Sequence, residues 1–114
     1  MLIRDILTGV GYFVLEAAHA EDALVAAENY PERIDLMVSD IVMPGISGFE
    51  LSKRLASNRP DMKVLFVSGY AEQETAKRAF ADPNVAYLQK PFGPAELASK
   101  VAEIISGSRG FKAN

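Results

Sequence analysis

Residues 63–69, Lys-Val-Leu-Phe-Val-Ser-Gly, are the stretch of sequence that decides the fold. Four apolar residues follow one another here without polar alternation, which predicts a strand over 63–67 that is buried on both faces of a sheet. Shorter apolar runs at 36–39 and 85–88 predict two more strands. Apolar residues at helical spacing predict helices between and after these strands, at 49–56, 72–80 and 94–105. Regular alternation of buried strands and helices predicts a parallel sheet with helices on both faces.

The first third of the chain continues this alternation. A stripe of apolar residues predicts a helix over 2–10, ended by nearby glycines. Aromatic and β-branched residues predict a short strand at 12–15, and the Ala-rich segment 21–29 predicts another helix. His19, the one histidine, lies at the turn between them, where a loop or helix-cap residue is expected rather than a catalytic base.

Length and composition fit one small domain over residues 1–106, followed by a flexible tail over 107–114. The net charge of −3 argues against nucleic-acid binding, because phosphate contacts need a basic face. Without cysteine, the chain can form neither a disulfide scaffold nor a thiolate zinc site. No apolar run approaches the length that spans a membrane, and we expect a cytoplasmic protein.

Polar side chains follow three of the predicted strands. Asp40 comes directly after the first of the three apolar runs described above, Ser68 after the second, and Lys90 two residues after the third. The carboxyl ends of parallel strands meet at one edge of a sheet, so we expect these side chains to lie together. A carboxylate, a hydroxyl and an ammonium suit phosphoryl transfer: the carboxylate is the nucleophile, and the other two groups bind the phosphoryl oxygens.

Each of these residues taken alone has an ordinary structural explanation. Asp40 could cap a turn, Ser68 could belong to a turn, and Lys90 could be solvated or a counter-ion of Asp40. Their matching positions on three strands favour the phosphoryl site. With one His and no Cys, a bound cation must be held by oxygen atoms, which points to Mg²⁺. Gly45 and Gly48 lack the pattern of a phosphate-binding loop, and we expect them to turn the chain tightly beside Asp40.

Three segments resemble the response regulator receiver domains of two-component systems. Residues 40–48, Asp-Ile-Val-Met-Pro-Gly-Ile-Ser-Gly, resemble the phosphoacceptor segment of that family. Residues 67–69, Val-Ser-Gly, resemble its switch hydroxyl segment, and residues 90–92, Lys-Pro-Phe, resemble its lysine–proline segment. The similarity covers nearly the whole chain. The segments 65–70 and 88–92 are most similar to receivers at the C-terminus of hybrid histidine kinases.

The resemblance implies a role for four residues. Asp40 would accept a phosphoryl group from a histidine kinase or a histidine phosphotransfer domain. Lys90 would hold the phosphoryl charge, and Ser68 would hydrogen-bond a phosphoryl oxygen and report phosphorylation. Tyr87 stands at the family's aromatic switch position, so the output surface is expected near it, between the last two predicted helices.

The resemblance also implies a Mg²⁺ ion and a cis peptide bond. Family members hold Mg²⁺ through the phosphoacceptor carboxylate, here Asp40, through a backbone carbonyl, here that of Val42, and through an acidic pair after a first strand. The bond from Lys90 to Pro91 would be cis, a conformation that is cheap only before proline. The acidic pair has no counterpart in this sequence, so we expect weak Mg²⁺ binding.

The implied fold is a flavodoxin-like, doubly wound α/β sheet of order 2-1-3-4-5, from which the central first strand is absent here. Its absence would leave the strand predicted at 12–15 without a neighbour and would expose an edge of the strand at 36–39. We therefore expect either an N-terminally truncated receiver or a reduced receiver that completes its sheet by pairing elsewhere. A second copy of the chain, bound through the sheet edge or the output face, is then an expected partner.

Other functions stay open on the sequence alone. The missing acidic pair suggests a degenerate receiver that binds protein partners independently of phosphorylation. A small flavodoxin-like domain that binds a ligand such as a nucleotide is less favoured, because no Gly-rich phosphate loop follows a predicted strand. None of these readings makes the chain an enzyme in the usual sense, since any phosphoryl transfer would end on its own Asp40.

Overall fold

The computed structural model describes residues 3–41, 45–79 and 83–107, which form five helices and three strands. The helices are α1 (Ile3–Gly9), α2 (Ala20–Asn29), α3 (Gly48–Ala56), α4 (Tyr70–Ala79) and α5 (Pro94–Gly107). The strands are β1 (Leu36–Asp40), β2 (Lys63–Ser68) and β3 (Val85–Gln89). The strands predicted around the candidate site are thus confirmed, each with one more residue at its carboxyl end. In this described part of the chain, no helix is long and apolar enough to cross a membrane.

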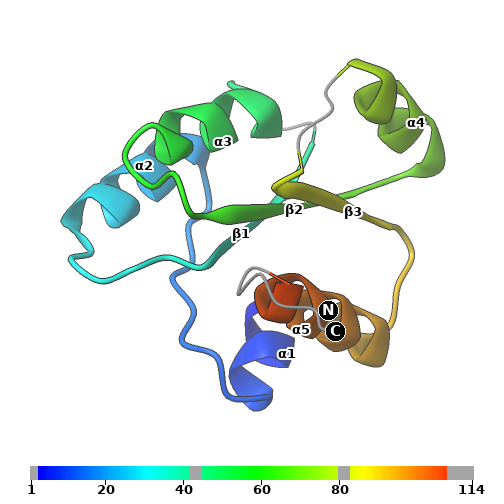
Figure 1. Cartoon of the computed structure of the whole chain (residues 1–114), viewed down its shortest axis with the longest axis horizontal. Coiled ribbons are helices and arrows are strands. Elements are labelled where there is room, and N and C mark those ends of the chain that lie inside the picture. Colours follow the sequence, from blue (N-terminus) through cyan, green and yellow to red (C-terminus); the bar gives the residue numbers. More distant parts are fainter. Residues whose placement is uncertain (1–2, 42–44, 80–82, 108–114) are drawn as a thin grey trace.

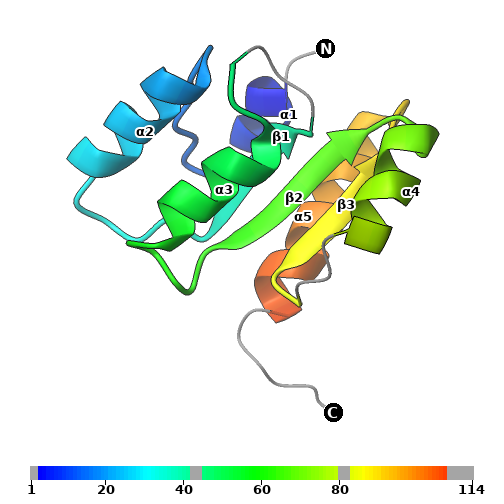
Figure 2. The ribbon, with the colours of Figure 1, turned by 90° about the horizontal axis from the view of Figure 1, so that it is seen from above.

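The strands form a parallel sheet of order β1-β2-β3, whose strands lie side by side in Figure 2. β2 is the central strand, and Leu65 and Phe66 within it are completely buried. The expectation of a strand covered on both faces is therefore confirmed. Asp40 lies opposite Val67 in the β1–β2 pair, and Ser68 lies opposite Gln89 in the β2–β3 pair. This register places the ends of all three strands at one edge.

Helices cover both faces of the sheet, as predicted (Figure 1). α2 and α3 lie over one face, where a core cluster that includes Met37, Leu51 and Phe66 is buried. α1 and α5 lie over the other face, above a cluster that includes Leu65 and Leu97. Successive side chains of a strand point to opposite faces, which is why the adjacent residues Leu65 and Phe66 belong to different clusters. We refer below to the α2–α3 cluster and the α1–α5 cluster.

The strand predicted at 12–15 is wrong. Residues 12–17 have no regular secondary structure, and none of the described strands pairs with them. Their side chains still alternate as in a strand: Tyr12 and Val14 pack on the α1–α5 cluster, whereas Phe13 and Leu15 are exposed. The sequence therefore carries the side-chain pattern of a strand. A strand also needs main-chain hydrogen bonds to a neighbour, and this segment has no neighbouring strand among the described residues.

The end of α2 is held by Arg59, a role that the sequence did not suggest. Its guanidinium group donates hydrogen bonds to three main-chain carbonyl oxygens: that of Tyr30 at 2.7 Å, and those of Ala27 and Glu32 at 2.8 Å each. The last carbonyl groups of a helix have no partner within the helix, and the planar arginine fork can bind several of them at once. Arg59 thus joins the turn after α3 to the end of α2.

The remaining expectations concern helix ends and the termini. His19 is the N-cap residue of α2, where its main-chain carbonyl accepts a hydrogen bond from Ala23 at 3.0 Å and its side chain makes no capping hydrogen bond, so the predicted loop or cap position is confirmed. The helices predicted over 2–10 and 21–29 correspond to α1 and α2. The predicted tail, 107–114, lies outside the described residues apart from Gly107, which ends α5.

Candidate functional site

Asp40 and Lys90 form an ion pair at the carboxyl edge of the sheet. Asp40 ends β1, and Lys90 directly follows β3. The Nζ atom of Lys90 donates to Oδ1 of Asp40 at 2.6 Å, although the two residues are 50 positions apart in the sequence. The Lys90 side chain is 50% exposed and that of Asp40 is 49% exposed, so an incoming group can reach both. Such an exposed pair contributes only about 0.2–1 kcal/mol to folding.

Ser68 ends the central strand of the same edge. The residue is 2% exposed, and its hydroxyl oxygen has no hydrogen-bond partner within the described residues. A buried polar group without a partner costs the folded state about 1–3 kcal/mol. A hydrogen bond between the Ser68 hydroxyl and a group that binds at the site would remove this cost. The carbonyl oxygen of Ser68 accepts the main-chain N–H of Lys90 at 2.8 Å, which ties the end of β2 to the start of the loop after β3. The peptide bond between Lys90 and Pro91 is cis.

The start of α3 packs against the main chain of Asp40. The N–H of Gly48 donates to the carbonyl oxygen of Ile41 at 2.8 Å. A Cβ atom at Gly48 would collide with the carbonyl oxygen of Asp40, well inside the 3.0 Å that real Cβ atoms keep. Gly45, at φ +84°, adopts a conformation that side chains rarely allow. As expected from the sequence, these glycines bring the chain tightly past the end of β1.

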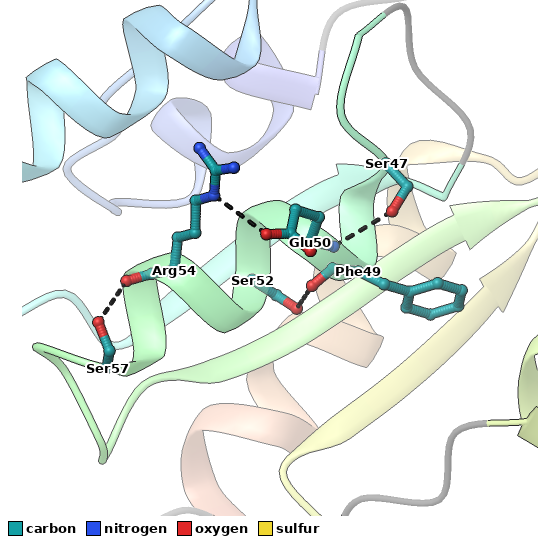
Figure 3. A network of polar contacts seen from close by, with 6 residues as sticks. All are labelled: Ser47, Phe49, Glu50, Ser52, Arg54 and Ser57. Carbon is teal, nitrogen blue, oxygen red and sulfur yellow. Dashed lines mark hydrogen bonds and ion pairs between the residues drawn. The ribbon is translucent and has the colours of Figure 1, made fainter.

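Polar contacts within α3 fix this helix start (Figure 3). The Oγ atom of Ser47 accepts the N–H of Glu50 at 3.2 Å, which is an N-terminal cap. One turn further on, Nε of Arg54 donates to the Glu50 carboxylate at 3.1 Å. The Phe49 side chain leaves the helix on the side of the sheet (Figure 3). The cap therefore fixes the start of α3, and with it the position from which the Phe49 ring reaches the sheet.

A row of three aromatic rings links this helix start to β3. The rings of Phe49 and Phe66 meet edge-on with centroids 4.9 Å apart, and those of Phe66 and Tyr87 are 6.0 Å apart. Tyr87 is partly buried against the α2–α3 cluster. The residue predicted as a switch therefore packs on the same face of the sheet as α3. Tyr87 was predicted from the sequence as a switch residue, but the row of rings was not, because ring contacts depend on which strands are neighbours.

The described residues do not complete a cation site. They contain no group of three or more His, Asp or Glu side chains that could hold a metal ion. Asp40 offers one carboxylate, of which Oδ1 is bonded to Lys90. The carbonyl group of Val42, which the resemblance assigned to Mg²⁺, lies outside the described residues. Mg²⁺ requires near-octahedral oxygen coordination, and a single carboxylate is a poor anchor for it.

Two other carboxylates close to the strand ends cap helices. A carboxylate oxygen of Glu72 accepts the N–H of Gly69 at 3.2 Å, and one of Glu96 accepts that of Gly93 at 2.9 Å. These one-sided caps lie at the first turns of α4 and α5, and α4 begins at Tyr70, two residues earlier than predicted. Sequence reasoning missed both caps, although a glutamate three residues after the candidate cap position is their signal.

The sequence is similar to those of known proteins. Residues 1–102 match the profile of the response regulator receiver domain. The chain is 42% identical over 95 residues to the Sensor kinase CckA of Brucella abortus (strain 2308), which covers 83% of this chain and 10% of the kinase. It is 30% identical over 100 residues to the response regulator receiver protein CpdR of the same strain, which covers 87% of this chain and 81% of that protein. The chain thus spans about a tenth of the length of the similar kinase.

Solved structures share the arrangement of the elements. A CheY-like receiver domain protein from Methanospirillum hungatei JF-1 superimposes with a TM-score of 0.75 at 34% identity, over 93% of this chain and 83% of that one. The receiver domain of the hybrid histidine kinase CckA superimposes with a TM-score of 0.73 at 37% identity, over 89% of this chain and 83% of that one. The fold is therefore the CheY-like α/β fold, with three parallel strands in the described residues.

Proposed function

The chain belongs to the response regulator receiver domain family, and we propose that it takes up a phosphoryl group on Asp40. Receiver domains are signalling modules of two-component systems rather than enzymes. Membership implies a histidine kinase or a histidine phosphotransfer domain as the partner, and the similarity to a hybrid kinase receiver favours a kinase as donor. The single observation that carries the proposal is the contact between Lys90 and Asp40, with the unpartnered hydroxyl of Ser68 at the same strand ends.

The proposed reaction moves one phosphoryl group between two side chains. A carboxylate oxygen of Asp40 attacks the phosphorus of a phosphohistidine; a P–O bond forms, the P–N bond breaks, and the imidazole leaves with the electron pair and takes a proton from solvent. The ammonium group of Lys90 neutralises charge on the phosphoryl oxygens. The hydroxyl of Ser68 donates to one of these oxygens and so gains the partner that it lacks. Receiver domains typically bind Mg²⁺, but the incomplete ligand set described above supplies no basis for assigning it a step here.

Transfer from a phosphorylated histidine kinase tests this proposal. Asp40→Asn should abolish the acid-labile, hydroxylamine-labile labelling of the chain, because the amide has nearly the same shape but is not a nucleophile. The matched control is Asp35→Asn, which removes an exposed carboxylate at the opposite end of β1 that pairs with Arg33 at 2.8 Å. This control should label as the parent does. Labelling that survives in Asp40→Asn would show that Asp40 is not the acceptor, and labelling that disappears equally in the control would show that the loss is not specific to Asp40.

Phosphorylation would change partner binding through the residues beside the site. A phosphoryl oxygen that bonds to Ser68 pulls on the end of β2, and Phe66 in the same strand contacts the ring of Tyr87. The output surface is therefore proposed near Tyr87, between α4 and α5. Partners at this surface include a second copy of the chain.

A second function is favoured by one observation, the incomplete set of cation ligands among the described residues. A degenerate receiver would bind its partner through the same output surface without phosphoryl transfer. In that case Asp40→Asn would leave partner affinity unchanged, and no phosphoryl group would appear on the chain after incubation with kinase. The phosphoacceptor proposal requires the opposite result in both measurements.

A further inference from the structure

Two buried side-chain oxygens lack a hydrogen-bond partner within the described residues, and both lie at the junction of β2 and α4. One is Oγ of Ser68, whose burial is described above. The other is Oε1 of Gln73, a residue that is 8% exposed. Buried polar groups nearly always have a partner, so two that lack one in the same part of the fold require an explanation.

The start of α4 brings these two side chains together. The N–H of Gln73 donates to the carbonyl oxygen of Gly69 at 3.1 Å, which makes Gly69 the N-cap residue of the helix. Ser68 directly precedes this cap, and Gln73 is the fourth residue of α4. Side chains at these two positions often pack against each other across a helix start. Such a pair is usually apolar, and here both members are polar.

The two side chains also share one face of the sheet. Ser68 follows Phe66 by two residues in β2, so both point to the face of the α2–α3 cluster. α4 lies on this same side of the sheet, beside β3 (Figure 1). The three residues of α4 that precede Gln73 are exposed. Gln73 is therefore the side chain that the start of this helix directs towards the sheet.

The two groups are complementary in their chemistry. The amide oxygen of glutamine only accepts hydrogen bonds, and the serine hydroxyl has one proton to donate. In the structure this hydroxyl is bonded neither to Gln73 nor to another described residue, and rotation about a single bond redirects it. Donation of the proton to a phosphoryl oxygen on Asp40 leaves none for Gln73, so the two hydrogen bonds exclude each other.

We propose that Gln73 is a positioning residue that competes with the phosphoryl group for the hydroxyl of Ser68. While Asp40 is unphosphorylated, Oε1 of Gln73 accepts the hydroxyl and stabilises this state. On phosphorylation the hydroxyl turns to a phosphoryl oxygen, and the amide oxygen loses its partner. Gln73 therefore opposes phosphorylation. The release of the hydroxyl rests on the proposed function, whereas its bond to Gln73 in the unphosphorylated chain does not.

The first experiment tests this bond in the unphosphorylated chain. Ser68→Ala removes the hydroxyl, and Gln73→Met removes the amide but keeps a side chain of similar length that favours a helix. Urea unfolding of the parent, the two single variants and the double variant measures their coupling. The unfolding equilibrium constant of the double variant should be about fivefold lower than the two single effects multiplied together predict. Agreement with that product within about twofold would overturn the proposal.

The second experiment measures the transfer equilibrium with a phosphorylated histidine kinase, as the ratio of labelled chain to labelled kinase. Gln73→Met should raise this ratio about fivefold, because only the unphosphorylated chain loses a hydrogen bond. The matched control is the same substitution in the Ser68→Ala chain, which has no hydroxyl to compete for. There the ratio should stay within about twofold of that of Ser68→Ala alone. An equal rise in both backgrounds would show that Gln73 acts through packing, and no rise in either would exclude competition.

A measurement on the parent chain decides the question if a variant does not fold. The carbonyl carbon of the Gln73 side chain is followed by NMR before and after phosphorylation by the kinase. Loss of a hydrogen bond at this carbonyl group should move its resonance upfield. A resonance that stays in place would overturn the proposal.

These experiments separate the role of Gln73 from that of Asp40. A parent chain that takes no label would refute the proposed function and the release of Ser68 with it, even where urea unfolding shows the coupling. Label on Asp40 without coupling between Ser68 and Gln73 would refute the role of Gln73 alone.

Discussion

Replacing Gly48 by alanine should disturb the candidate site through the main chain of Asp40. The added Cβ would lie about 1 Å closer to the carbonyl oxygen of Asp40 than the 3.4 Å at which ordinary van der Waals contact begins. The obstructing atom belongs to the main chain, so either the end of β1 or the start of α3 must move by about that distance. Overpacking of this kind costs about 1–3 kcal/mol, of which the higher helix propensity of alanine offsets up to about 1 kcal/mol. With a central overpacking cost of about 2 kcal/mol, the free energy of unfolding should therefore fall by about 1–2 kcal/mol.

The same displacement should slow phosphoryl uptake. A misplacement of about 1 Å at a reacting group can reduce its rate on the order of 100-fold, and Gly48→Ala has this effect where the end of β1, which carries the Asp40 carboxylate, is the part that moves. The assay is the initial rate of label transfer from a phosphorylated kinase, together with urea unfolding. The matched control is Gly9→Ala at the end of α1, where the added Cβ meets nothing within 4 Å. This control should keep its transfer rate and should be as stable as the parent or more so.

One pair of results would refute this reasoning. If Gly48→Ala had the stability and the transfer rate of Gly9→Ala, the close approach of α3 to Asp40 would not exist in the protein. Loss of stability with an unchanged transfer rate would confirm the contact but would separate it from the function of Asp40.

Three further substitutions test other parts of the account. Lys90→Ala should slow phosphoryl transfer on the order of 100-fold, because a positive charge at the reacting atoms is lost. The free energy of unfolding measured in urea should change by about 1 kcal/mol or less. A transfer rate near that of the parent would exclude a role of Lys90 in neutralising the phosphoryl charge. Tyr87→Ala should remove the change in partner affinity that phosphorylation causes, whereas Tyr87→Phe, which keeps the ring, should retain it, as titration of the partner would measure; retained coupling in Tyr87→Ala would contradict the proposed route. Arg59→Ala should lower the free energy of unfolding by about 2–3 kcal/mol, because three hydrogen bonds to carbonyl groups are lost, and Arg59→Lys by about half as much; equal losses in both would show that the arginine fork has no special part.

The candidate site was predictable because it depends on the ends of strands. Apolar runs located β1, β2 and β3, and the carboxyl ends of parallel strands share one edge. That rule predicted that Asp40 and Lys90, 50 positions apart in the sequence, lie close together, and in the structure Nζ of Lys90 is 2.6 Å from Oδ1 of Asp40. The rule says nothing of the direction of a side chain, and the burial of the Ser68 hydroxyl without a partner appears only in the structure.

Two of the misses have a common physical cause, since each depends on a neighbour that local sequence does not specify. Residues 12–15 have strand-forming side chains, but a strand exists only where a second strand accepts its hydrogen bonds. Arg59 caps α2 from a turn about 30 positions later, so no pattern within α2 indicates it. The caps made by Glu72 and Glu96 differ, because their spacing is local and was available in the sequence.

Identification of the phosphorylated side chain tests the central claim most directly. The chain is incubated with a phosphorylated histidine kinase and then treated with borohydride, which reduces an aspartyl phosphate to homoserine and leaves free carboxylates unchanged. Peptide mass spectrometry then locates the modified position. The account predicts homoserine at residue 40, with Asp35 and Asp61 unmodified. Homoserine at another position, or none after incubation under conditions in which the same kinase labels its known receiver, would contradict it.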